Sequence, residues 1–185
     1  KNFILGMQEA VEDIYMILYN PPHAKVLLSL EEISLLKQSV QNLVGIKCAG
    51  GDEQWYSQRR ELLDDFSVFV PGHTVVYGKP LGANGSYSNV ACLSPNGAVK
   101  IWDLIEKDYE KAQELEAKVL NFMKQYILPF ADKLSNTGLD KLLASVGGWG
   151  PVSEKVLWPY DGATAEDVKK IKIHANNELE EILNV

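Results

Sequence analysis

The chain has 185 residues, of which 46% are hydrophobic and 23% are charged. This balance is typical of a globular protein with its own core and excludes a disordered or fibrous chain. Eighteen Lys and Arg residues stand against 25 Asp and Glu residues, and the formal net charge of −7 argues against a nucleic-acid or anionic-membrane partner.

The apolar runs and the cysteines favour a soluble protein of the cytoplasm. The longest apolar run is far shorter than the roughly 20 residues that a membrane span needs, and no signal segment opens the sequence. Cys48 and Cys92 cannot make a disulfide scaffold, and neither has a Cys-x-x-Cys spacing, so we expect a reducing compartment. The sequence begins with Lys1 rather than Met, which indicates that processing or truncation removed a start.

Four short runs of apolar, β-branched or aromatic residues predict buried strands, at residues 15–19, 43–47, 66–70 and 86–93. Helix-length amphipathic segments separate them. Ser29 followed by Glu32 is a capping-box pattern at the start of the first such helix. Asp52 is a plausible N-cap for a second helix that ends at Leu63.

After residue 93 the pattern predicts helices only, at 107–126, 139–146 and 164–183, the last opened by Thr164 and Asp167 as a possible capping box. The preceding alternation of strands and helices predicts βα units and a parallel sheet. Periodicity alone leaves two architectures open. One is a small open α/β sheet, and the other is half of an eight-stranded barrel, which typically needs roughly 250 residues.

Lys47 is the final residue of an otherwise apolar predicted strand. This position puts its amine at the carboxyl edge of the sheet, where α/β folds place their sites. Desolvation there favours a neutral amine, which can attack a carbonyl carbon and form a Schiff base. The alternative is a lysine that reaches from the strand end into solvent.

Tyr19 occupies the equivalent place on the preceding strand. Adjacent parallel strands of a right-handed βαβ unit would bring Tyr19 and Lys47 to the same rim. A phenol beside an imine can relay protons during formation and breakdown of the carbinolamine. The alternative is an ordinary aromatic residue of the core or rim.

Four motifs follow one another in the sequence: ILYNPP at 17–22, VGIK at 44–47, VPGH at 70–73 and GSYSNVA at 85–91. In order and spacing they resemble the dihydrodipicolinate synthase and N-acetylneuraminate lyase family of class I aldolases, and residues 156–171 resemble that family's C-terminal segment. The resemblance implies a (β/α)8 TIM barrel, of which this chain holds strands five to eight plus the C-terminal helices. Residues 1–105 would form the C-terminal half of the barrel, and residues 106–185 a helical extension.

The resemblance also assigns site residues. Lys47 would be the Schiff-base lysine that condenses with pyruvate or another 2-oxo acid, and Tyr19 the proton-relay tyrosine. Gly72 falls at the glycine that closes strand seven, where the backbone approaches substrate, and His73 follows it. Strand eight, which lines the pocket floor, would carry four further candidates, namely Ser86, Tyr87, Ser88 and Asn89.

Departures from the family narrow the substrate. Dihydrodipicolinate synthases have an arginine five residues after the relay tyrosine, and this position is Ala24. Sialic acid lyases have acidic residues shortly after the strand-seven glycine, where this sequence reads His73, Thr74 and Val75. A lyase or dehydratase that acts on a smaller, sugar-acid-like 2-oxo acid therefore remains open.

Other residues are weaker candidates. His23 and His73 both follow strand ends, so they could bind substrate or, with Asp52, a metal, although such residues more often belong to plain surface loops. Strand alternation points Cys48 away from Lys47, as a buried thiol.

Two functions remain open. The first is a lyase, aldolase or dehydratase that acts on a small 2-oxo acid through a lysine Schiff base, without a metal or other cofactor, and that is a homotetramer as the family implies. Its remaining part would be cleaved, lost or supplied by another chain. The second is a catalytically incomplete half-barrel that pairs with itself or with a missing N-terminal half, because an open half-barrel exposes edge strands and an apolar face.

Overall fold

A computed structural model describes residues 1–11 and 13–184 and divides the chain into two compact units. The first unit comprises Lys1–Pro71 and Tyr77–Tyr87, and the second comprises Gly72–Val76 and Ser88–Val185. Each unit is described by itself.

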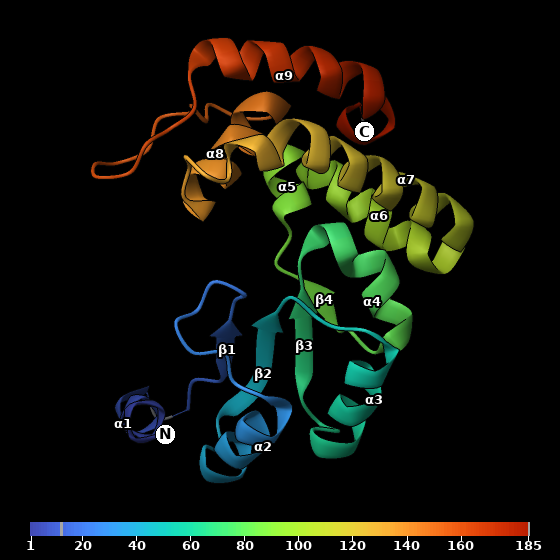
Figure 1. The fold of residues 1–185 in the computed structure, drawn as a ribbon. Helices are drawn as coiled ribbons and strands as arrows, with labels where there is room; N and C mark the ends of the chain where they lie inside the picture. Colours follow the sequence, from blue (N-terminus) through green and yellow to red (C-terminus); the bar gives the residue numbers. More distant parts are fainter. Residues whose placement is uncertain (12, 185) are drawn as a thin grey trace. The chain divides into compact units, whose positions relative to one another are not determined.

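The first unit is built on a parallel sheet in the order β1-β2-β3-β4 (Figure 1). Its elements in chain order are α1 (Asn2–Val11), β1 (Met16–Asn20), α2 (Leu30–Ser39), β2 (Leu43–Cys48), α3 (Glu53–Leu62), β3 (Ser67–Val70), α4 (Val75–Leu81) from Tyr77 onward, and β4 (Gly85–Ser86). The predicted parallel α/β sheet is confirmed.

The core of the first unit lies on one side of the sheet. Ile46 and Val68 of the strands and Ile33 of α2 are at most 1% exposed. On the other side, Ile17 and Tyr19 of β1 are 38% and 51% exposed. Within this unit the sheet is therefore covered by helices on one face only.

The predicted starts of α2 and α3 are confirmed. Both are marked by capping hydrogen bonds between residues close in sequence. Ser29 Oγ accepts from the Glu32 amide at 3.2 Å, and the Ser29 amide donates to the Glu32 carboxylate at 2.8 Å, which completes the capping box of α2. Asp52 accepts from the Trp55 amide at 2.8 Å and caps α3.

The predicted strand at 86–93 is wrong beyond Ser86. Residues Asn89–Leu93 form helix α5, because the Ser88 hydroxyl accepts a hydrogen bond from the Ala91 amide at 3.2 Å and acts as N-cap. A further helix that the sequence analysis missed, α6 (Pro95–Lys107), begins at once behind the N-cap Ser94.

The second unit is helical, and a short 3₁₀ turn, η1 (Gly72–Thr74), belongs to it. After α5 and α6 come α7 (Tyr109–Phe122), a π-helical turn η2 (Met123–Ile127), a 3₁₀ turn η3 (Leu128–Phe130), α8 (Asn136–Gly147), α9 (Ala165–Glu178) and α10 (Glu180–Leu183). The predicted capping box of Thr164 and Asp167 at α9 is confirmed. The core of the second unit includes Leu115, Phe122, Leu142 and Val146, all fully buried.

The chain passes from one unit to the other at three places, after Pro71, after Val76 and after Tyr87. The predicted division of the chain into half of a barrel (residues 1–105) and a helical extension (residues 106–185) is not tested by these two units and stays a prediction. Across residues 1–11 and 13–184, no helix combines the length and the apolarity needed to span a membrane.

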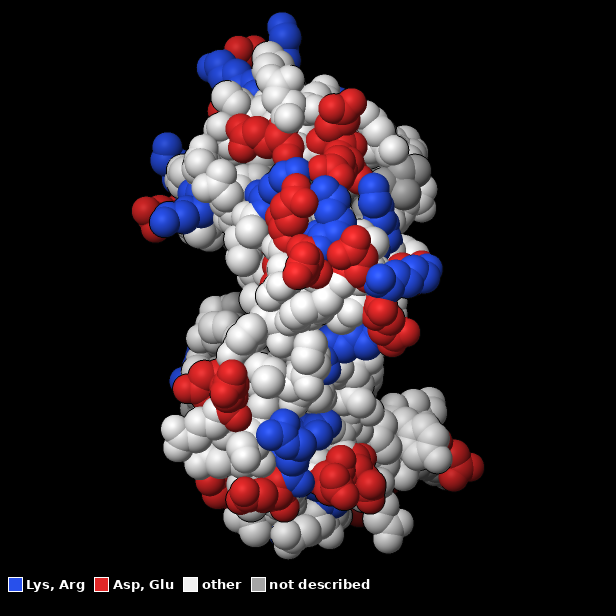
Figure 2. Space-filling model, turned by 90° about the vertical axis from the view of Figure 1, so that its right-hand side faces the viewer, with Lys and Arg blue, Asp and Glu red and all other residues white. Residues whose placement is uncertain are grey.

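Charges of both signs are interleaved on the face shown in Figure 2. In the second unit, Lys111 and Lys118 of α7 each pair with Glu114 of α7 and Glu181 of α10, with N–O distances between 2.7 and 2.9 Å.

Candidate active site

One row of residues crosses all four strands of the first unit. Tyr19 of β1 is the register partner of Lys47 of β2. Lys47 is in turn the partner of Phe69 of β3, and Phe69 is the partner of Gly85 of β4. Partners in register lie on the same face of a sheet, and here it is the face opposite the buried Ile46. The predicted proximity of Tyr19 and Lys47 is therefore present in the structure.

The Lys47 amine is flanked by two aromatic rings. Its Nζ atom lies 4.4 Å from the centre of the Tyr19 ring and 5.5 Å from the centre of the Tyr87 ring. Both tyrosines are half exposed, and no carboxylate pairs with Lys47 among the residues that the structure describes. Ring faces attract the ammonium form weakly and leave the nitrogen open to a reactant.

Phe69 supports the Tyr87 ring. The two ring centres are 5.3 Å apart with an interplanar angle of 64°, an edge-to-face arrangement. A Cβ atom at Gly85 would come within 3.1 Å of the Phe69 ring, so the absent side chain of Gly85 leaves the space that the ring uses. The sequence analysis did not single out Phe69, because an aromatic residue inside a strand carries no distinctive signal.

A buried arginine fixes the short strand β4. The Asn84 side-chain oxygen accepts from the Val68 amide at 2.9 Å and from Arg59 Nη2 of α3 at 3.2 Å. Arg59 also donates to the Phe66 carbonyl, and burial lowers the pKa of its guanidinium. These bonds tie the residue before β4 to both β3 and α3, and thereby position Tyr87.

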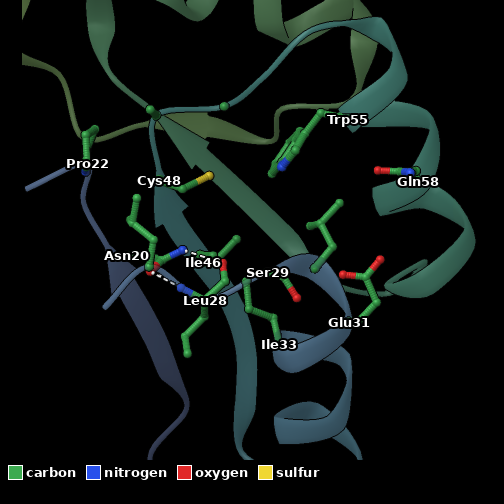
Figure 3. A pocket seen from close by; sticks show the side chains of 14 residues that line it. Asn20, Pro22, Leu28, Ser29, Glu31, Ile33, Ile46, Cys48, Trp55 and Gln58 are labelled. Carbon is green, nitrogen blue, oxygen red and sulfur yellow. Dashed lines mark hydrogen bonds between the residues drawn. The ribbon is translucent and has the colours of Figure 1, made fainter. Parts of the chain in front are cut away.

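The loop after β1 is closed by Asn20. Its amide nitrogen donates to the Leu28 carbonyl at 3.1 Å, and its oxygen accepts from the Leu28 amide at 3.2 Å (Figure 3). The loop carries His23, whose ring centre lies 6.4 Å from that of Tyr19, edge to face. The structure thus places this candidate beside Tyr19, the predicted proton relay.

A pocket of about 370 Å³ lies behind the sheet, between the strand ends and the helices (Figure 3). Ile46, Cys48 and Trp55 line it, whereas Lys47 and Tyr19 do not. Cys48 is buried on the face opposite Lys47, as predicted, and burial raises the pKa of its thiol. This pocket is therefore separate from the lysine face.

Ser86 also lies on that opposite face. It is the register partner of Val70, which is 1% exposed, and its hydroxyl is buried without a hydrogen-bond partner among the described residues. The structure does not bring this predicted substrate-binding residue to the Lys47 amine.

The other predicted site residues, Gly72, His73, Ser88 and Asn89, belong to the second unit, and two of them pair. The Asn89 amide nitrogen lies 2.8 Å from Nδ1 of His73, close enough to donate to it, with the Asn89 oxygen at 3.0 Å. Gly72 is buried, and a Cβ there would overlap the Ser88 hydroxyl. Asn89 is the first residue of α5 and not, as predicted, part of a strand.

A metal site has no geometric support. Among residues 1–11 and 13–184, no group of three or more His, Cys, Asp or Glu side chains could hold an ion. His23 and Asp52 belong to the first unit and His73 to the second, so the alternative that combined them stays a prediction.

Comparison with known proteins identifies the family. The profile of the dihydrodipicolinate synthetase family matches residues 7–172, and the chain belongs to this family. A 4-hydroxy-tetrahydrodipicolinate synthase from Teredinibacter turnerae is 33% identical over 106 residues, which are 56% of this chain and 36% of that protein. The resemblance read from the sequence motifs is therefore confirmed.

Solved structures show the same fold. An N-acetylneuraminate lyase from Fusobacterium nucleatum superposes with a TM-score of 0.73 at 16% identity, over 96% of this chain and 59% of that one. A prophage protein of the dihydrodipicolinic acid synthase family from E. coli K12, solved in complex with pyruvate, gives a TM-score of 0.75 at 20% identity, over 96% and 61%. The chain thus spans about three-fifths of the length of these structures.

Proposed function

We propose that Lys47 forms a Schiff base with pyruvate or a related 2-oxo acid, as part of a lyase, aldolase or dehydratase. The observation that carries the proposal is the placement of the Lys47 amine at the carboxyl edge of the sheet, between the rings of Tyr19 and Tyr87. Family membership supports the reaction class, and one solved relative is described as a complex with pyruvate.

The chemistry follows from the two side chains. The neutral amine attacks the ketone carbon and gives a carbinolamine, whose hydroxyl leaves as water once it is protonated, and a C=N bond forms. The Tyr19 phenol would carry that proton, since Tyr19 is the register partner of Lys47 and its ring contacts the amine. The resulting iminium would withdraw electrons from the bond that is made or broken at the neighbouring carbon.

The loop after β1 bears on the choice of substrate. Ala24 provides no cation where dihydrodipicolinate synthases have arginine, so lysine biosynthesis loses support and a smaller, sugar-acid-like 2-oxo acid remains open. The roles of Gly72, His73, Ser86 and Asn89 in substrate binding also stay predictions.

We also infer that β1 to β4 correspond to strands five to eight of a (β/α)8 barrel. Coverage of about three-fifths of the solved relatives supports this assignment. The alternative function, a catalytically incomplete half-barrel that pairs with itself or with an N-terminal half, is favoured by the exposure of Ile17 and Tyr19 on the open sheet face. Analytical sedimentation tests the second function, because a chain that stays monomeric at high concentration would contradict a half-barrel that pairs with itself.

Borohydride trapping tests the proposed lysine. The protein is incubated with pyruvate, reduced and digested, and the adduct is located by mass spectrometry. We expect it on the peptide that contains Lys47, and its absence in Lys47→Ala. Lys25→Ala, in the loop that follows β1, is the matched control and should retain the adduct. An adduct that persists in Lys47→Ala would overturn the assignment.

A further inference from the structure

The pocket behind the sheet of the first unit lies outside the proposed Schiff-base chemistry. It is enclosed by the carboxyl ends of β1 and β2 and by residues of α2 and α3, and its volume of about 370 Å³ is typical of small-molecule sites (Figure 3). Ile33, Ile46 and Cys48, each at most 9% exposed, form an apolar wall. Within residues 1–11 and 13–184, those that line the pocket include none of the predicted catalytic or substrate-binding residues.

Trp55 of α3 extends into this pocket. Figure 3 shows its indole pointing from α3 toward Cys48. The ring meets Tyr56 edge to face, with the ring centres 4.9 Å apart. Its N–H donates a hydrogen bond to no residue in the described part of the chain. The cavity is thus bordered by an aromatic ring, and such rings attract cations to their faces.

Glu31 is the one charged side chain among the described residues that line the pocket. Its carboxylate accepts hydrogen bonds from its own backbone amide and from Ser29, and these lower its pKa, so it is ionised at neutral pH. No Lys, Arg or His side chain pairs with it within residues 1–11 and 13–184. The pocket therefore carries a negative charge that no side-chain cation neutralises.

The surroundings of the pocket are acidic as well. α2 carries Glu31 and Glu32 in its first turn, and α3 has Asp52 as its N-cap and Glu53 in its first turn. These four carboxylates outweigh the two helix N-termini, which count as about half a positive charge each. They also outweigh Lys25, which belongs to the loop after β1 and does not line the pocket. The electrostatic potential at the pocket therefore favours a cation over an anion.

We propose that this pocket binds a small amphipathic ammonium compound, with its apolar chain against Ile33, Ile46 and Cys48 and its positive head at Glu31. Burial of the chain against apolar side chains would supply most of the affinity. The carboxylate would select a cation over a neutral or anionic head group. Binding needs neither the Lys47 amine nor an imine, so this inference does not rest on the function proposed above.

Probes that share one chain length separate these contributions. Hexylamine, 1-hexanol and hexanoate are each titrated at neutral pH into the ¹⁵N-labelled full chain and followed by NMR. The reporter is the indole N–H of Trp55, one of four tryptophans in the chain, whose signal is identified by its loss in Trp55→Phe. We expect saturable shifts of this signal and of the Ile46 and Cys48 amides, with hexylamine binding most tightly and hexanoate most weakly.

Methylamine, which has the head group without the chain, is the control for simple cation binding. It should cause no saturable shift at the concentrations at which hexylamine saturates. Shifts equal to those of hexylamine would mean that only a cation binds, and would overturn the proposal. Equal affinities for hexylamine and hexanoate would overturn it too, because the charge of Glu31 would then select nothing.

Two variants test the two ends of the ligand. Glu31→Gln should weaken hexylamine binding by about threefold, the size expected for one exposed ion pair, and leave hexanol binding unchanged. Leu27→Gln, at a lining residue that is already 54% exposed, should weaken both probes. Glu61→Gln, at an exposed glutamate near the other end of α3, is the matched control and should change neither.

A hexylamine affinity that is the same in Glu31→Gln and Glu61→Gln would contradict the proposal, as would shifts that map outside the pocket. Lys47→Ala separates this inference from the proposed enzyme. It should lose the borohydride adduct and bind hexylamine as the wild type does. Loss of hexylamine binding in Lys47→Ala would place the ligand on the lysine face and overturn the assignment to this pocket.

Discussion

The Nζ atom of Lys47 lies 4.4 Å from the centre of the Tyr19 ring, although 27 residues separate the two in sequence. Parallel register brings them together, because Tyr19 and Lys47 are partners on β1 and β2. The tyrosine contributes two separable things to this pair. Its ring face holds the amine, and its phenol is available for proton transfer.

Tyr19→Phe separates the ring from the phenol. This variant keeps the aromatic face and loses the proton, so we expect imine trapping with pyruvate to slow by about 10²-fold while the free energy of unfolding stays the same. The time course of borohydride trapping measures the first effect, and denaturant unfolding the second. Equal trapping rates in the variant and the wild type would exclude Tyr19 as the proton relay.

Tyr87 tests the other flank of the lysine. Tyr87→Ala removes the edge-to-face contact with Phe69 and the ring beside Lys47, and should lower the free energy of unfolding by about 1–2 kcal/mol. Tyr87→Phe keeps both ring contacts and should be nearly neutral. Urea denaturation of both variants decides the matter, and similar losses in the two would show that the hydroxyl, not the ring, is what stabilises the site.

Gly72 tests the packing under the His73–Asn89 pair. Gly72→Ala puts a methyl group into the Ser88 hydroxyl and should cost about 1–3 kcal/mol. Ser88→Gly, which loses the N-cap side chain at a cost of only a few tenths of a kcal/mol, should restore part of that loss when combined with Gly72→Ala. Gly150→Ala, with open space around its Cβ position, is the control and should be neutral. Strictly additive losses in the double variant would contradict this account.

The four-charge network of the second unit predicts a pH dependence. Hydrogen bonds from Lys111 and Lys118 lower the pKa of Glu181 to about 2, and those to Glu114 and Glu181 raise the pKa of Lys118 to about 12. A lowered carboxyl pKa gives stability that is present above the ordinary value of 4.5 and is lost as the pH falls towards 2. A raised lysine pKa gives stability that is present below 10.5 and is lost as the pH rises towards 12.

NMR titration of the Glu181 carboxyl measures this directly. The midpoint should lie well below 4.5 at low salt, and should move back towards 4.5 in Lys118→Gln and at high salt, because all four side chains are between 30% and 49% exposed and are screened. A wild-type midpoint at 4.5 would mean that the network does not persist in solution.

Local signals made much of the fold predictable. The capping boxes at Ser29 and Thr164 fix helix starts through hydrogen bonds that span three residues, so the sequence pattern is sufficient to find them. Tyr19 and Lys47 were also predictable as neighbours, because both end apolar strands in consecutive βα units.

The region around β4 was not predictable in the same way. Residues 90–93 are uncharged and largely apolar, which resembles a buried strand, yet the Ser88 cap and packing against α8 make Asn89–Leu93 helical. The contact of Tyr87 with Lys47 depends on β4 being only two residues long and on Phe69 filling the space beside Gly85. Such features arise from tertiary packing and leave no periodic pattern in the sequence.

Arg59 links the two faces of the sheet in the first unit. Its guanidinium reaches from α3, behind the sheet, to Asn84, the residue that leads into β4 and to Tyr87 on the lysine face. A substitution that displaces α3 would therefore move Tyr87, and with it one of the two rings beside the Lys47 amine. The rate of the proposed imine formation would then depend partly on α3, which packs on the opposite face of the sheet from Lys47.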